Sequence, residues 1–270
     1  FINKFKLYNK IDYQQNIMDC KGCASKIDLT TLKSSLPKDI ITSSEDASQI
    51  TKGSQYVNSI DMITSIVTDP FLLGKISANH ALSDIYASFS KPLSAQMILQ
   101  LPKSSQKVHS EDLKQIQEGA KLVLNKNSCV LSGGHTMIGQ DDNPVVGFSI
   151  VGKTFNKPTN KINNKDVVIL TEKLGTGIIF AGVNSNAISS NYISEVSNQL
   201  ENGNVKFGNI LYQIKPLEAT DITGYGLGNH LINLINRNKH IKGITILKNK
   251  IKLFKGVLEC LQKNVNSSFY

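Results

Sequence analysis

The sequence predicts a mixed fold of the α/β or α+β class, in which helices and strands follow one another along the chain. Of the 270 residues, 40% are hydrophobic and 19% are charged, which is typical of a globular protein with a core of normal size. Short apolar segments of strand length alternate with segments in which apolar residues recur at helical spacing. The sequence contains no internal repeat. Periodicity alone does not choose between the two classes.

The N-terminal half is expected to begin with a loose polar arm, residues 1–21, and then to alternate strands with helices. The segment 55–67, QYVNSIDMITSIV, mixes β-branched and polar residues as a half-buried strand does. A helix is expected from Pro70 onward, because proline is tolerated in a first helical turn. The segment 94–101, SAQMILQL, is expected to be the next strand.

A second helix is expected to begin at Ser110. Serine is a favourable N-cap residue, and Glu111 and Asp112 would place negative charge in the first turn. One apolar face would follow at helical spacing, formed by Leu113, Ile116, Ala120 and Val123.

Two further strands and a linker are expected after this helix. The segment 128–134, SCVLSGG, is interpreted as a short strand that ends in a glycine turn, and 144–152, PVVGFSIVG, as another strand. The polar segment 153–166 is the best candidate for a linker between domains. The predicted organisation is therefore an N-terminal domain of residues 22–155 and a C-terminal domain of residues 156–270.

The C-terminal half is expected to repeat the alternation. The segment 167–182, VVILTEKLGTGIIFAG, has the order strand, glycine turn and helix. The segment 219–237, ATDITGYGLGNHLINLINR, has a glycine-rich turn that leads into an amphipathic helix. Because the chain begins with Phe1, it is expected to be a fragment or a processed product.

The net charge and the number of cysteines indicate which classes of binding partner and which cellular compartment to expect. The formal net charge is +9, but the lysines are scattered and no basic run of five occurs, so nucleic acid is not an expected partner and anionic small molecules are. Aromatic residues are not interleaved with the lysines as a base-stacking surface requires. Four cysteines are too few for a disulfide scaffold. No run of about 18 apolar residues is present, so no membrane association is expected and the location is predicted to be cytoplasmic.

The pair Cys20 and Cys23, followed by Lys26, is compatible with three chemical roles. It could be half of a zinc site, although no second CxxC or CxxH is present. It could be a redox-active dithiol. It could also be one nucleophilic cysteine whose thiolate is favoured by the nearby ammonium of Lys26. Spacing alone leaves the three open.

Dispersed carboxylates and glycine-rich segments suggest a phosphate site without identifying one. Asp46, Asp61, Asp84 and Asp221 could supply the oxygen ligands that Mg²⁺ takes beside a phosphate, although Asp84 could instead pair with His80 one helical turn earlier. Backbone N–H groups of glycine turns can hold phosphate, and the candidate turns are 133–136, 175–177 and 223–226. None of them matches a Walker or complete GxGxxG pattern.

Taken in order, these segments resemble the selenophosphate synthetase family. The resemblance extends from residue 22 to about residue 235, and SGGHT and TDITGYGLGNHL are its most specific parts. The matching segments are GCASKI (22–27), ED (45–46), DPFLLGKISANHALSDIYA (69–87), SGGHTMIGQDDNPVVGFSIVG (132–152), ILTEKLGTGI (169–178) and ATDITGYGLGNHL (219–231).

The resemblance implies an ATP- and Mg²⁺-dependent enzyme that makes selenophosphate from selenide, ATP and water and releases AMP and orthophosphate. It implies the two-domain fold of aminoimidazole ribonucleotide synthetases, with N-terminal domains that pair into a barrel in a homodimer. A protein that delivers selenium is a further expected partner. The implied catalytic residues are Cys23 and Lys26. The implied ATP-binding residues are Lys26, Glu45, Asp61, Asp84, Gly134, His135 and Thr136, and the implied metal ligands are Asp46, Asp84 and Asp221.

The chain departs from the family pattern at several positions. Ser25 stands where a second cysteine is frequent, His80 stands where the family has Asn, and ASFS at 87–90 replaces a segment with two glycines. The glycine-rich lead into the catalytic cysteine is IMDCKG, and the sequence ends at Tyr270, before the family's C-terminal DPQTSGG-type segment. These departures leave two alternatives: a catalytically weak nucleotide-binding paralogue or fragment, or a related ATP-using enzyme that acts on another small nucleophile.

Overall fold

The computed structural model describes residues 26–27, 29–37, 46–155 and 161–267. The predicted N-terminal arm, the Cys20–Cys23 pair and Glu45 lie outside these residues. Within the described residues, no helix is both long and apolar enough to cross a bilayer.

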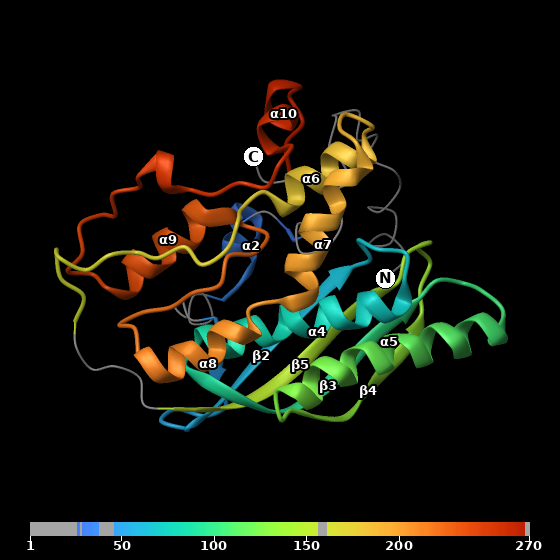
Figure 1. Cartoon of the computed structure of the whole chain (residues 1–270). Helices are drawn as coiled ribbons and strands as arrows, with labels where there is room; N and C mark the ends of the chain where they lie inside the picture. The colour runs from blue at the N-terminus through green and yellow to red at the C-terminus, as the bar shows by residue number, and fades with distance from the viewer. Residues whose placement is uncertain (1–25, 28, 38–45, 156–160, 268–270) are drawn as a thin grey trace.

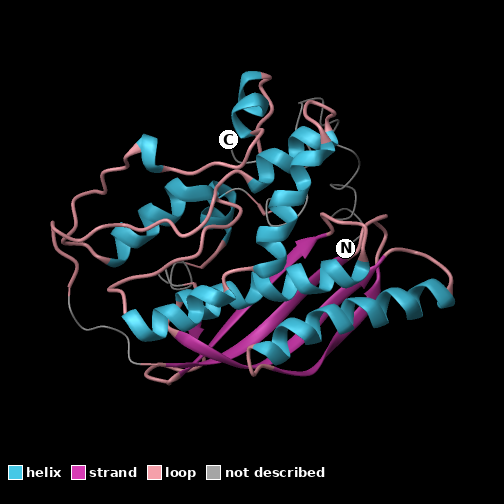
Figure 2. Cartoon of the chain, in the orientation of Figure 1, coloured by secondary structure: helices cyan, strands magenta, loops and turns pink. Residues whose placement is uncertain are grey.

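A five-stranded sheet forms one half of the molecule (Figure 2). Its strands lie in the order β1-β2-β5-β3-β4, in which β3 and β4 run parallel and the other neighbours are antiparallel. The strands are β1 (Ser48–Gln49), β2 (Tyr56–Thr64), β3 (Ser90–Leu101), β4 (Val130–Ile138) and β5 (Val145–Thr154). The mixed α/β class is thereby confirmed.

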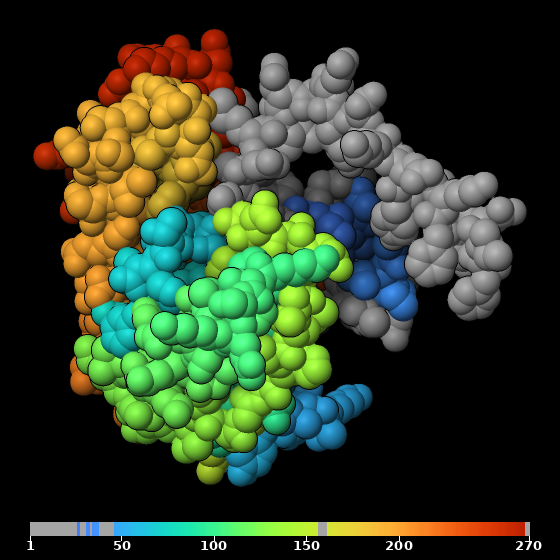
Figure 3. All heavy atoms as spheres, turned by 90° about the vertical axis from the view of Figure 1, so that its right-hand side faces the viewer, coloured from blue at the N-terminus to red at the C-terminus, as the bar shows by residue number. Residues whose placement is uncertain are grey.

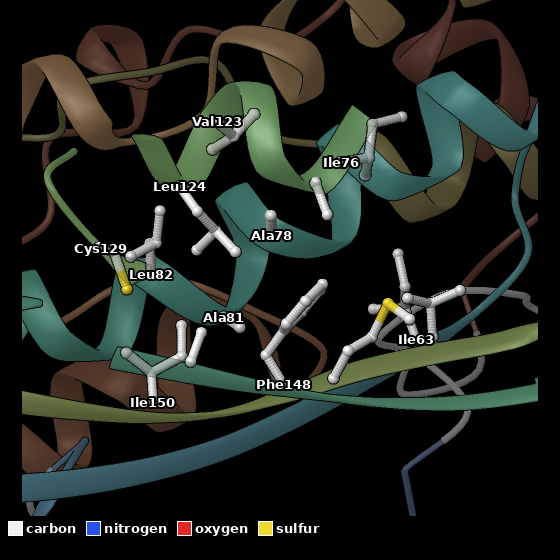
Figure 4. Close-up of a cluster of buried hydrophobic side chains, with 14 of the residues drawn as sticks. Ile63, Ile76, Ala78, Ala81, Leu82, Val123, Leu124, Cys129, Phe148 and Ile150 are labelled. Carbon is white, nitrogen blue, oxygen red and sulfur yellow. The ribbon is translucent and has the colours of Figure 1, made fainter. Parts of the chain in front are cut away.

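Two long helices, α4 (Pro70–Ala87) and α5 (Gln106–Lys126), cover one face of this sheet (Figure 1). Helix α4 begins where predicted, because Asp69 accepts a hydrogen bond from the N–H of Leu72 and Pro70 occupies the first turn. Alternate residues of β5, including Phe148 and Ile150, point at the helices and are fully buried. Figure 4 shows these side chains packed beneath Ala81 and Leu82 of α4.

The two helices approach closely because each presents a glycine to the other's backbone. A Cβ at Gly74 would lie 2.1 Å from the carbonyl oxygen of Ile116, and one at Gly119 would lie 2.0 Å from that of Phe71. Both distances are far below van der Waals contact, so the crossing requires glycine at both positions.

The other half of the molecule is built mainly from short helices (Figure 2). In the space-filling view of Figure 3, its orange and red residues lie above and beside the green and cyan residues of the first half. Helices α7 and α8 pack against α4, and Asn79 of α4 donates to the carbonyl oxygen of Glu201 at 2.6 Å. A second apolar cluster lies among residues 179–265. The remaining elements are α2 (Leu29–Ser35), α6 (Thr176–Asn184), η3 (Ser190–Tyr192), α7 (Ile193–Asn202), α8 (Val205–Ile214), α9 (Gly226–Arg237), η4 (Lys248–Lys250) and α10 (Val257–Gln262).

The predicted start of α5 at Ser110 is wrong. The N-cap is Ser105, whose hydroxyl accepts from the N–H of Val108 at 3.4 Å. Ser110 lies inside the helix, because the first turn is formed by the polar residues that precede it. The acidic pair Glu111 and Asp112 therefore falls after the first turn.

The predicted glycine turn at 133–136 is also wrong, because these residues continue strand β4. Gly134 pairs with Met97 of β3, and a Cβ at Gly134 would lie 2.0 Å from the Met97 carbonyl oxygen. Glycine is therefore needed here for the close approach of two strands and not for a turn.

The strand predicted at the start of 167–182 does not form among the described residues. Val167, Val168 and Ile169 are exposed, and the nearest pairing is a single bridge between Leu174 and Leu253. β-Branched residues form a strand only where a neighbouring strand pairs with them. The helix predicted after the Gly175 turn is present as α6.

Candidate active site

The carboxylates predicted from dispersed segments converge beside the sheet. Asp61 lies on β2 and Asp84 on α4, while Asp46 precedes β1 and Asp221 precedes α9. Oxygen atoms of Asp46 and Asp221 and a ring nitrogen of His230 lie within 4.8 Å of one another. The fold therefore assembles one acidic site from residues that are up to 175 positions apart, Asp46 and Asp221.

Asp61 is the carboxylate that is stabilised in its charged form. His80 Nε2 lies 2.8 Å from Asp61 Oδ2, and Lys26 Nζ lies 3.7 Å from Asp61 Oδ1. Burial acts to raise the pKa of Asp61, but the contact with His80 and the charges of His80 and Lys26 outweigh it, and the pKa lies below its ordinary value. His80 thus contacts Asp61, and not Asp84, the alternative partner that helical spacing allows.

Asp84 and Asp221 are stabilised in their neutral forms. Burial, followed by the charge of Asp221, raises the pKa of Asp84 to about 9. Ser59 donates to Asp84 Oδ2 at 2.6 Å but does not offset these effects. The pKa of Asp221 is also raised, chiefly by burial.

Asp46 is a third carboxyl group in this site whose pKa is raised. Burial and the charge of Asp221 raise its pKa to about 6, although Arg237 and Thr220 act in the opposite direction. Arg237 Nη1 lies 3.4 Å from Asp46 Oδ2, and Arg237 Nη2 donates to the carbonyl oxygen of Ala219 at 3.0 Å. Arg237 Nε also lies 3.6 Å from a carboxylate oxygen of Glu218, so Arg237 links the loop before α9 to Asp46.

His230 orients Asp46 through a hydroxyl group. The N–H of Thr223 donates to His230 Nε2 at 3.3 Å, which leaves the proton of the neutral ring on Nδ1. Burial lowers the pKa of His230, so the ring is held neutral. Nδ1 lies 3.4 Å from Thr220 Oγ1, which in turn donates to Asp46 Oδ1 at 3.1 Å. In this tautomer His230 positions Asp46 through Thr220.

The carboxylate group has the donor chemistry of a site for Mg²⁺. Asp221 Oδ2 is buried and has no hydrogen-bond partner within the described part of the chain. An uncompensated buried acceptor of this kind is costly unless a cation fills the position. Hard oxygen donors from Asp46, Asp84 and Asp221 are the ligands that Mg²⁺ prefers, so the residues fit this metal.

A cavity of about 760 Å³ lies next to the carboxylates. Asp46 and Asp84 contribute to its wall, and Asn58 of β2 and Ser149 of β5 provide uncharged polar groups. The cavity is open to solvent on one side, and its lining mixes polar and apolar groups.

Three predicted ATP-binding residues are not brought to this cluster. Gly134, His135 and Thr136 are exposed on β4, at the edge of the sheet, with β3 and β5 between them and β2. Three strand spacings separate β4 from β2, which is about 14 Å. Cys23 and Glu45 lie outside the described residues.

Sequence reasoning missed four residues that shape the site, namely Thr220, Tyr225, His230 and Arg237. All four lie in or next to the glycine-rich segment 219–237. The spacing of His230 and Arg237 on one amphipathic helix was a signal, since residues seven apart share a helix face. The partners of His230 lie in the same segment, whereas Asp46, the partner of Arg237, lies in a distant segment that the sequence does not pair with it.

Comparisons with known proteins agree with this architecture. Residues 44–154 match the family model described as AIR synthase related protein, N-terminal domain. The chain is 30% identical over 226 residues to the selenide, water dikinase of Campylobacter jejuni (strain RM1221), covering 81% of this chain and 64% of that protein. It is 29% identical over 260 residues to the selenide, water dikinase of Carboxydothermus hydrogenoformans, covering 90% of this chain and 73% of that protein.

The chain thus spans about two thirds of the length of these curated relatives. Among solved structures, it is similar to one titled as the crystal structure of a HypE–HypF complex, with a TM-score of 0.66, 14% identity, and coverage of 88% of this chain and 78% of that one. The structure of Escherichia coli HypE, described as a hydrogenase maturation protein, has a TM-score of 0.58 at 15% identity and covers 90% and 71%. At these identities the likeness shows a shared fold.

Proposed function

Because the chain is 29–30% identical to selenide, water dikinases over most of its length, we propose that it is a member of this family and catalyses phosphorylation of selenide by ATP at the carboxylate site. The reaction consumes selenide, ATP and water and yields selenophosphate, AMP and orthophosphate. The observation that carries the proposal is the cluster of Asp46, Asp221 and His230. The carboxyl group of Asp84 interacts with both aspartates of this cluster, and Lys26 lies beside Asp61.

Asp46, Asp84 and Asp221 would hold Mg²⁺, which when bound supplies positive charge that neutralises the triphosphate. Burial is the main cause of their raised pKa values, and the charges of neighbouring carboxylates raise them further. The Thr220–His230 pair holds Asp46 in place. These residues would therefore bind and orient the polyphosphate in a site that is ready for a cation.

Lys26 would contribute a second positive charge, aimed at a phosphate as a point charge. Its ammonium lies beside Asp61, whose carboxylate remains charged. Cys23 would handle selenium or assist its delivery, and a protein that supplies selenium is part of this proposal. Cysteine and selenide both require a reducing compartment, so the cytoplasm is the location that the proposal implies.

We further propose that two copies pair through the face of the sheet opposite α4 and α5. Ile60 and Met62 of β2 and Met137 of β4 are large apolar side chains that stand exposed. Gly134, His135 and Thr136 lie too far from Asp61 in the same sheet to share one phosphate with it. A paired arrangement would allow these residues to contact ATP at the partner's carboxylates.

The two apolar clusters are proposed to mark the predicted domains, residues 22–155 and 156–270. One cluster lies among residues 47–150 and the other among residues 179–265, and Ile66 and Leu200 pack against both. Expression of residues 22–155 alone tests this division, because an independent domain should unfold cooperatively without the second cluster.

Phosphorus NMR of the purified chain with ATP, Mg²⁺ and selenide, under anaerobic reducing conditions, tests the activity. A selenophosphate signal with AMP in equal amount is the expected result. Cys23→Ser should abolish selenide-dependent turnover and leave ATP binding largely intact, since its thiol is assigned to selenium and not to the nucleotide. Tight ATP binding without turnover in the unsubstituted chain would favour the weak-paralogue alternative.

A further inference from the structure

Tyr225 contacts the segment that carries Lys26, although 198 residues separate Tyr225 from Ile27. The Tyr225 hydroxyl donates to the Ile27 carbonyl oxygen at 2.9 Å. The Lys26 ammonium lies 5.7 Å from the centre of the Tyr225 ring, within the range of a cation–π contact. One side chain thus holds both the backbone beside Lys26 and the charged group of Lys26.

The turn that carries Tyr225 is fixed by its own hydrogen bonds. Thr223 donates its N–H to His230, and its carbonyl oxygen accepts from the N–H of Gly226 at 2.9 Å. Gly226 has a φ of 73°, in the left-handed region that glycine adopts without strain. The Tyr225 carbonyl oxygen accepts from the side chain of Asn229 on α9 at 2.9 Å. Tyr225 therefore projects from a rigid base.

Lys26 needs such a support because its side chain is long and only partly enclosed. About 31% of it is exposed, and a lysine has many rotamers that do not approach the carboxylates. The Lys26 ammonium lies 3.7 Å from Asp61 Oδ1, which is longer than a hydrogen bond, so this ion pair alone does not fix the orientation of the ammonium.

We propose that Tyr225 is a positioning residue that holds Lys26 against the carboxylate site. The hydroxyl fixes the backbone at Ile27 and the ring faces the ammonium, so that Lys26 stands ready for a phosphate of the nucleotide. This inference rests on the role of Lys26 in the proposed function. Nothing in it requires Tyr225 to touch the nucleotide.

Tyr225→Phe tests the proposal, because it removes the hydroxyl and keeps the ring. Tyr192→Phe is the matched control, since it removes a hydroxyl that contacts Glu259 at 3.4 Å in the other half of the molecule. Acylation of Lys26 by an amine-specific reagent, followed by peptide mass spectrometry, should be about 2- to 10-fold faster in Tyr225→Phe, as expected for losing one hydrogen bond. The control should label like the unsubstituted chain. An unchanged Lys26 labelling rate in Tyr225→Phe overturns the proposal.

A double-mutant cycle with Lys26→Ala supplies a second readout. Tyr225→Phe should weaken Mg²⁺–ATP binding, measured by titration calorimetry, by about 2- to 10-fold in the unsubstituted chain. The same substitution should have no effect once Lys26 is alanine. An equal loss in both backgrounds would mean that Tyr225 acts on the nucleotide directly, and it would overturn the positioning role.

The two experiments separate this inference from the proposed function. Labelling of Lys26 requires neither ATP nor selenide, so its acceleration in Tyr225→Phe supports the contact even if no selenophosphate forms. Normal turnover in the unsubstituted chain, combined with unchanged labelling in the variant, leaves the activity standing and removes Tyr225 from it.

Discussion

The buried carboxyl group of Asp84 makes the folded state less stable when it ionises. Its pKa of about 9, against an ordinary value of 3.8, means that the folded chain binds a proton at pH values where the unfolded chain has lost it. The resulting stabilisation is fully present below about pH 4 and is lost as the pH rises through about 9. A bound cation removes this penalty, because the ionised form then has a partner.

Asp84→Asn should therefore stabilise the metal-free protein at alkaline pH. The amide cannot ionise and can still accept from Ser59. We expect the melting temperature at pH 8.5 in EDTA to rise by about 2–4 °C, corresponding to about 1 kcal/mol, and the gain to vanish near pH 4. Asp142→Asn, in an exposed loop, is the matched control and should change neither value. A lower melting temperature for Asp84→Asn at pH 8.5 would contradict the assigned cause.

The same substitution should weaken Mg²⁺-dependent nucleotide binding. An amide is a poorer ligand for a hard cation than a carboxylate, so titration calorimetry of ATP should show a loss of about tenfold or more with Mg²⁺ present. Asp142→Asn again serves as control. Unchanged calorimetry would remove Asp84 from the metal site.

The structure also predicts how substitution of Arg237 changes the stability of the protein. Arg237→Met should destabilise the metal-free protein by about 3 kcal/mol, because it leaves Asp46 and Glu218 without their buried cation. Added Mg²⁺ should restore part of this loss, since the metal would supply positive charge at Asp46. Urea unfolding with and without Mg²⁺ measures both effects, and an equal loss in both conditions would show that Arg237 and the metal do not share Asp46.

The residues of the site were predictable in kind but not in arrangement. Asp46, Asp61, Asp84 and Asp221 were identified one by one, and only a family resemblance grouped them. Their contacts with His80, Thr220 and Arg237 depend on side chains from separate segments meeting in space. Periodicity describes one element at a time and contains no information on such meetings.

At the level of elements, the crossing of α4 and α5 determines how closely the helical layer packs on the sheet. Gly119→Ala should destabilise the protein by about 2–4 kcal/mol, because its Cβ would meet the Phe71 carbonyl and force the helices apart. Gly228→Ala on α9 is the matched control: no atom lies within 4 Å of the added Cβ, and alanine should be neutral or stabilise the helix by up to about 1 kcal/mol. Guanidinium unfolding measures both, and a small effect at Gly119 would show that the helices can separate without cost.

Elements with a strong local pattern were predicted well, and those that depend on a partner were not. The cap formed by Asp69 and Pro70 placed α4 correctly, since both signals act within one turn. The acidic residues after Ser110 favour it as an N-cap, but the helix begins one turn earlier, after Ser105. Gly133 and Gly134 suggest a turn in isolation and become strand residues only because β3 approaches them.

At the scale of the whole molecule, the described residues cover the sheet on one face and leave the other bare. The helical layer buries Phe148 and Ile150, whereas β4 is exposed along nearly its whole length. An edge strand in this condition is a site for association. The proposed pairing of two copies would cover it and would complete the nucleotide site at the same time.

Met137→Lys should disrupt that pairing. Met137 pairs with Gln100 of β3, whose neighbours Leu99 and Leu101 face the helices, so Met137 lies on the opposite, bare face with 49% of its surface exposed. A charge placed on each copy at this position would be buried against its symmetry mate at a cost of several kcal/mol.

Sedimentation velocity should therefore show a dimer for the unsubstituted chain and a monomer for Met137→Lys. Leu258→Lys, at an exposed site on α10, should remain dimeric. If the unsubstituted chain sediments as a monomer with Mg²⁺ and ATP present, the bare face is not a contact between copies, and Gly134, His135 and Thr136 lose their proposed place at the nucleotide.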